Sequence, residues 1–173
     1  MLLSLSTAAV LAATLPKFED YPVTSVHNGS PAEPIIDTPV KKLYRTRIRQ
    51  GVAKGWGVRR DGWNGAEQAG VNFAGHYFVV TWGCGVPCMM MVIVDSLTGR
   101  VYLPPLSIGN SGNETIGLPF LGGGNAQFQY RLNSRLMIMK TSGQLSDSTC
   151  HERYYLWEDN RWSLLLQHTV PCP

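Results

Sequence analysis

The chain has 173 residues, of which 44% are hydrophobic and 16% are charged, and its formal net charge is +3. This length is typical of one domain, and the apolar content excludes an intrinsically disordered chain. The 18 glycines and 11 prolines indicate many turns, which a fold rich in β-strands requires.

Residues 1–13, MLLSLSTAAVLAA, are apolar or small and carry no charge. This pattern is typical of a secretory signal peptide, with cleavage expected near Ala12 or Ala13. No basic residue precedes the run, which we interpret as a wrong or truncated start. The alternative to a signal peptide is a short N-terminal helix. No run in the chain is long enough to span a bilayer. We therefore predict a periplasmic or secreted protein.

The next segment, residues 14–37, is predicted to be an extended lead. Pro22, Pro31 and Pro34 exclude a helix there, because proline lacks the backbone N–H that a helix needs. The remaining residues, 38–173, are predicted to form a single β-rich domain.

A helix is predicted to begin at Thr38 and Pro39, because Thr is a good N-cap and Pro suits the first helical turn. One face is apolar and the opposite face is basic. The apolar residues are Val40, Leu43, Tyr44, Ile48 and Val52, and the basic residues are Lys41, Lys42, Arg45 and Arg49.

Arg47 falls within the apolar stripe of this helix. A buried guanidinium needs a carboxylate or several carbonyls. We therefore predict that Arg47 is buried and paired, with Asp95 as the candidate partner. The alternative is that its charged end extends past the helix edge into water.

No acidic residue interrupts residues 41–60, where the cations are Lys41, Lys42, Arg45, Arg47, Arg49, Lys54, Arg59 and Arg60. Nucleic-acid binding domains are usually basic throughout, whereas the pI of this chain is about 8.7. We interpret the run as the solvated face of the helix and predict no nucleic-acid partner. Weak contact with an anionic cell-wall polymer is the lesser alternative.

Strands are predicted after residue 70. The segments 73–82 and 89–94 are apolar on both alternating faces, which is typical of strands inside a covered sheet. Asp95 and Gly99 indicate a turn, followed by a return strand at 100–103. A Gly/Asn-rich excursion at 107–125 precedes further strands at 126–131, 135–141, 153–157 and 162–168.

The order of elements predicts an α+β fold that is mainly antiparallel. One N-terminal helix packs on a twisted meander of seven or eight strands, with hairpins like single β-propeller blades. The chain is too short for a closed propeller. The predicted core is Val40, Leu43, Tyr44, Ile48, Phe73, Tyr77, Phe78, Val80, Trp82, Met91, Ile93, Leu136, Ile138, Leu156, Trp157 and Leu164.

The four cysteines are Cys84, Cys88, Cys150 and Cys172. An even number behind an export signal favours disulfides. The most economical pairing is Cys84 with Cys88 and Cys150 with Cys172. A bridge from Cys84 or Cys88 to Cys150 is a serious alternative.

Cysteine catalysis is not favoured by the spacing. His76 and Cys84 lie eight residues apart on one predicted strand, roughly 26 Å at the usual rise per residue. His151, next to Cys150, remains a candidate through space. Cys84, Cys88, Cys150 and a histidine could form a zinc site, but disulfides would consume the thiols. We predict no catalytic residues, no metal and no cofactor, and interpret His76 as a core histidine.

Three motifs carry a resemblance. NFAGHY at 72–77, WGCGxxC at 82–88 and DxxTGxVY at 95–102 resemble a set of uncharacterised secreted bacterial proteins. The resemblance runs from about Tyr44 to Trp162. It implies export and a shared fold, but no established activity.

By elimination, the sequence favours an exported, non-catalytic binding protein, such as an inhibitor or immunity-type partner of another exported protein. The candidate contact residues are His76, Trp82, Arg47 and Asp95. One alternative is an enzyme or metal site centred on His76, Cys84 and Cys88. Another is a structural component of the envelope that uses the basic helix face. The oligomeric state stays open.

Overall fold

A computed structural model describes residues 14–54, 70–85, 88–104, 127–142 and 149–171. The predicted signal peptide at 1–13, the whole excursion at 107–125 and Cys172 lie outside the described residues, as do the side chains of Cys84 and Cys88. In chain order the elements are η1 (Phe18–Asp20), α1 (Pro39–Lys54), β1 (Tyr77–Gly85), β2 (Cys88–Asp95), β3 (Val101–Tyr102), β4 (Gln127–Tyr130), β5 (Leu136–Ser142), β6 (Thr149–Glu158) and β7 (Arg161–Pro171).

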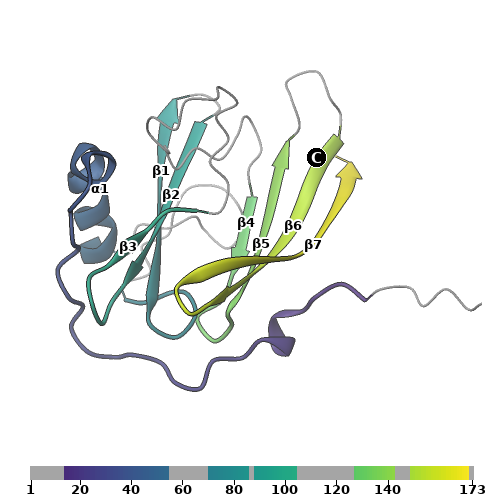
Figure 1. The fold of residues 1–173 in the computed structure, drawn as a ribbon, viewed down its shortest axis with the longest axis horizontal. Coiled ribbons are helices and arrows are strands. Elements are labelled where there is room, and N and C mark those ends of the chain that lie inside the picture. Colours follow the sequence, from purple (N-terminus) through teal and green to yellow (C-terminus); the bar gives the residue numbers. More distant parts are fainter. Residues whose placement is uncertain (1–13, 55–69, 86–87, 105–126, 143–148, 172–173) are drawn as a thin grey trace, which may run out of the picture.

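The class is α+β with mainly antiparallel strands, as predicted, and the described strands form two sheets instead of one. Sheet 1 has the order β1-β2-β3, and sheet 2 has the order β4-β5-β6-β7. Neither is a closed barrel or a propeller. Figure 1 shows α1, sheet 1 and sheet 2 as successive layers. The strands of sheet 1 are apolar on both faces, so they need cover on both sides.

Sheet 1 is the middle layer. Its residues Phe78, Val80 and Val92 pack with Ile48 and Val52 of α1. The alternating residues Tyr77, Val79, Met91 and Ile93 pack with Met137, Met139, Tyr155 and Trp157 of sheet 2. The molecule therefore has two apolar cores, one on each face of sheet 1.

The helix begins as predicted. The Lys41 amide donates to Thr38 Oγ1 at 3.3 Å, and Pro39 is the first helical residue. A Cβ on Gly51 would lie 2.1 Å from Val80 Cγ1, so glycine allows α1 to approach sheet 1 closely. Ile48 and Val52 are the buried hydrophobic residues of α1 at this contact.

Several predicted burials are wrong. Leu43 is 65% exposed, and Arg47 is exposed and has no ion pair among the described residues. Both lie outside the strip of α1, with Ile48 and Val52, that packs on the sheet. Leu164 is 53% exposed because β7 is an edge strand, and Ile138 and Leu156 are only half-buried. The described helix is not long and apolar enough to cross a membrane.

Residues 17–37, here called the strap, run along one end of both sheets (Figure 1). The backbone of the strap donates from Val23 to Asn133, from His27 to Gly75, from Ala32 to Ser96 and from Ile35 to Gly99, at 2.7–3.2 Å. Asn133, Ser96 and Gly99 lie in turns between strands, and Gly75 lies in the turn before β1. The predicted extended lead is therefore an integral part of the fold.

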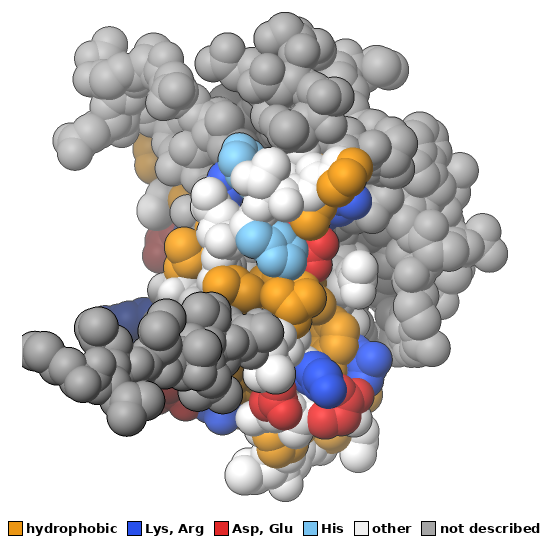
Figure 2. Space-filling view, turned by 90° about the vertical axis from the view of Figure 1, so that its right-hand side faces the viewer, with side chains coloured by type: hydrophobic (Ala, Val, Ile, Leu, Met, Phe, Trp, Pro, Cys, Tyr) orange, Lys and Arg blue, Asp and Glu red, His pale blue; other side chains and the backbone are white. Residues whose placement is uncertain are grey.

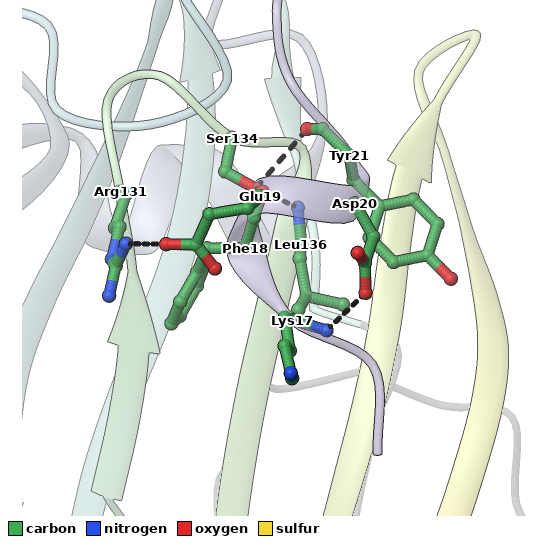
Figure 3. Close-up of polar contacts among 8 residues, drawn as sticks. All are labelled: Lys17, Phe18, Glu19, Asp20, Tyr21, Arg131, Ser134 and Leu136. Carbon is green, nitrogen blue, oxygen red and sulfur yellow. Dashed lines mark hydrogen bonds and ion pairs between the residues drawn. The ribbon is translucent and has the colours of Figure 1, made fainter. Parts of the chain in front are cut away.

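The start of the strap is fixed to the turn between β4 and β5 (Figure 3). Ser134 Oγ donates to the carbonyl of Phe18 at 2.8 Å and accepts from the Leu136 amide at 3.2 Å. Arg131 pairs with Glu19 at 2.6 Å and lies 4.3 Å from the centre of the Phe18 ring. Ser134 is 1% exposed, so its hydrogen bonds are shielded from water, whereas the Arg131–Glu19 pair is exposed.

Two glycines make room for the strap. A Cβ on Gly75 would lie 2.4 Å from the Ser25 carbonyl oxygen, and one on Gly99 would lie 2.1 Å from that of Glu33. Both residues have positive φ, at 81° and 73°. A side chain at either position would strain the backbone and push the strap away.

We predict that Gly99→Ala lowers the free energy of unfolding by about 1–3 kcal/mol from the φ strain alone, with more from the clash. Urea unfolding measures this. Gly83→Ala is the matched control, because a Cβ there meets nothing within 4 Å. Equal stability of the two variants would contradict the role given to the strap.

Candidate functional site

His76 lies in a tight turn before β1, not inside a strand as predicted. Ala74 and Gly75 in this turn have positive φ, and Phe73 forms a bridge with Tyr77. The His76 side chain is 32% exposed and contacts the Tyr77 ring in a tilted arrangement, at 4.1 Å between ring centres. Its Nε2 lies 3.9 Å from Asp95 Oδ1. It is a partly exposed histidine at one end of the sandwich.

Asp95 is buried and is used by its own turn. Its carboxylate accepts from the Leu97 amide at 2.8 Å and from Thr98 Oγ1 at 2.7 Å. This confirms the predicted turn and explains why the predicted pair with Arg47 is wrong. The turn already supplies the donors that the carboxylate needs.

The candidate contact residues do not converge on one site. Trp82 is 7% exposed and packs against Tyr44 of α1, at 5.3 Å between ring centres. It lies five residues beyond Tyr77 on β1, roughly 17 Å from the His76 end. Trp82 is a core residue between sheet 1 and the helix.

The backbone also separates His76 from the first two cysteines. β1 and β2 pair from Tyr77 with Asp95 at one end to Gly85 with Cys88 at the other. Cys84 and Cys88 therefore lie at the end of the hairpin away from His76. No group of three or more His, Cys, Asp or Glu within the described ranges could hold a metal ion.

Asn72 has a role that the sequence did not indicate. Its side chain accepts from the Val79 amide at 2.7 Å and donates to the Val79 carbonyl at 3.3 Å. It thus satisfies part of the unpaired edge of β1. An isolated polar residue ahead of an apolar strand was the only available signal.

The opposite edge of the sandwich is different. β7 has eleven residues, pairs with β6, and forms an edge of sheet 2 within the described structure. None of its residues is buried, and Leu164 and Leu165 are 53% and 38% exposed. A register shift opposite Tyr154 and Tyr155 places a bulge at Leu165.

A polar group lies on the outer face of sheet 2 beside this edge. Tyr154 Oη donates to Glu152 at 2.6 Å, and His168 Nε2 lies 3.9 Å from the same carboxylate. Burial, with the Glu152 contact, raises the pKa of Tyr154 to about 12. Figure 2 shows histidine and acidic side chains next to apolar ones on this side of the molecule. Tyr154 is only 3% exposed, so this polar group is largely shielded from solvent.

Comparison with protein-family models, with curated proteins and with solved structures gave no match. The resemblance carried by the three motifs therefore stays a prediction.

Partial burial lowers the pKa of His76, and a nearby His27 acts in the same direction, against the opposing effect of Asp95. The unfolded chain then binds a proton at His76 more readily than the folded chain does. We predict that stability falls as pH decreases through the ordinary pKa of 6.5. The His76→Gln variant should lose less stability than the wild type between about pH 7.5 and 5.5. Urea midpoints at both pH values measure this, and parallel losses would contradict it.

Proposed function

We propose that the chain is an exported, non-catalytic binding protein that holds an extended segment of another exported protein along β7. The observation that carries the proposal is the long exposed edge of this strand. Backbone N–H and C=O groups on an edge can pair with an added strand, and side-chain pockets then give specificity.

The chemistry of β7 supports this use. Proteins usually block exposed edges with charged residues, proline or short strands. Between Trp162 and Pro171 the strand has no Asp, Glu, Lys or Arg, and its centre is Leu164, Leu165 and Leu166. The bulge at Leu165 limits regular pairing to the stretches on either side of it.

The contrast with β1 strengthens the argument. β1 is also an edge in the described structure, but its residues from Tyr77 to Trp82 are buried and Asn72 occupies part of its backbone edge. One edge is thus protected within the fold, whereas the other presents apolar side chains to solvent.

The proposal includes export and at least one disulfide. Cys150 is fully buried and faces Val170 across β6 and β7, and Cys172 follows Val170 by two residues in the sequence. No free cysteine occurs in the part of the chain that the structure describes. These observations favour a Cys150–Cys172 bridge that fixes the end of β7.

We predict that alkylation of the native protein without reductant leaves Cys150 and Cys172 unlabelled. The Cys172→Ser variant should lose about 2–4 kcal/mol of stability. Peptide mapping by mass spectrometry and urea unfolding provide the two measurements. Labelling of Cys150 in the native protein would remove the bridge from the proposal.

We predict that Leu164→Lys abolishes capture of a stoichiometric exported partner from envelope extract of the producing cells. The lysine places a charge on the apolar edge and opposes strand addition. Leu97→Lys is the matched control, because Leu97 is 54% exposed in a turn of sheet 1 and Leu164 is 53% exposed.

Hydrogen exchange of the complex provides an independent measurement. The backbone amides of β7 should become protected when the partner binds. The proposed binding mode would be contradicted if Leu164→Lys and Leu97→Lys captured the partner equally and the β7 amides gained no protection from exchange.

A further inference from the structure

The solvent face of α1 has an unbalanced charge. Lys41 pairs with Asp37 at 2.7 Å, and Arg49 pairs with Glu33 at 2.9 Å, so the strap neutralises these two cations. Lys42, Arg45 and Arg47 are exposed and have no ion pair among the described residues. The Arg45 guanidinium donates only to the Lys42 carbonyl of its own helix, at 3.0 Å.

An apolar residue lies within this basic face. Leu43 is 65% exposed, the highest value among the exposed large hydrophobic residues of the described structure. It precedes Arg47 by four residues, so the two side chains are neighbours on the helix surface. Arginine beside an exposed apolar side chain is a combination enriched in protein interfaces.

We propose that this basic face, defined by Lys42, Leu43 and Arg47, is a docking surface for an acidic protein segment that carries an apolar residue. The two cations select carboxylates by charge complementarity, and Leu43 packs against the apolar residue. The proposal is independent of β7, because it uses other residues on another element.

The same observations argue against a membrane or a nucleic acid as the occupant. Helices that lie in a membrane interface insert a broad apolar face. The apolar face of α1 is already buried on sheet 1 through Ile48 and Val52. Nucleic-acid surfaces add exposed aromatic residues for stacking, and the exposed face of α1 has none.

The two surfaces lie on opposite sides of the molecule, with α1 outside sheet 1 and β7 at the far edge of sheet 2 (Figure 1). Binding at one surface therefore leaves the other accessible. A chain with both surfaces could hold two polypeptides at once.

The test uses the full mature chain and a fluorescent peptide of glutamates with one central leucine. Fluorescence anisotropy should show binding that weakens with salt. The double variant Lys42→Glu, Arg47→Glu should bind at least about tenfold more weakly, because it places like charges in contact. Leu43→Ala should weaken binding of this peptide but not of the same peptide with glutamate in place of leucine.

Lys17→Glu is the control for net charge. Lys17 is exposed on the strap, outside the basic face, and its substitution changes the net charge as much as the single variant Lys42→Glu, with which it is compared. Unchanged binding in this variant supports the proposal. A loss equal to that of Lys42→Glu, no binding of the peptide, or tighter binding of heparin or phosphatidylglycerol vesicles would overturn it.

Discussion

The contacts between the strap and the turns hold the two sheets together at one end of the sandwich. Sheet 1 is reached through Gly75, Ser96 and Gly99, and sheet 2 through Asn133 and Ser134. Hydrogen bonds between backbone groups do not depend on the identity of the side chains. The sequence is therefore constrained mainly where the strap needs space to approach the turns. That space exists because positions 75 and 99 lack a side chain. The strap thus fixes this end of the two sheets, together with the direct hydrogen bond from the Gly75 amide to the Leu132 carbonyl at 2.7 Å.

Sheet 1 is fixed by further contacts with the helix, with the turn after β2 and along the edge of β1. Gly51 lets α1 approach Val80, Asn72 occupies the Val79 edge, and Asp95 caps the turn after β2. Tyr77 then links the layers, because its Oη donates to Asn160 in the turn between β6 and β7 at 2.8 Å. Sheet 1 is therefore enclosed on both faces and at one edge. Sheet 2 is enclosed on its inner face, and β7 remains open to solvent.

The sequence predicted those features that depend on neighbouring residues. The Thr38 cap, the Asp95 turn and the order of the hairpins follow from local hydrogen bonding and alternation, and the structure has them. Features that depend on distant residues were missed. The exposure of Leu43, Arg47 and Leu164 depends on how closely α1 packs and on which strand forms an edge. The division into two sheets also depends on contacts that no periodicity encodes. For the site, the pattern drew attention to His76, but it could not reveal that β7 is open.

The three motifs contribute to the fold more than to a site. Asn72 is hydrogen-bonded to the backbone of Val79, and Trp82 packs against Tyr44 of α1. Asp95 caps its own turn, and Gly99 lies against the Glu33 carbonyl. A side chain with its polar groups satisfied internally has little capacity left to bind a ligand. Among the motif residues, Ser96 Oγ and Tyr102 Oη are buried without a hydrogen-bond partner. Outside the motifs, the exposed groups of the described structure include the unpaired backbone edge of β7 and three cations of α1 without an ion pair. Because both are on surfaces that the motifs do not reach, the same framework could carry different binding specificities when these two surfaces change.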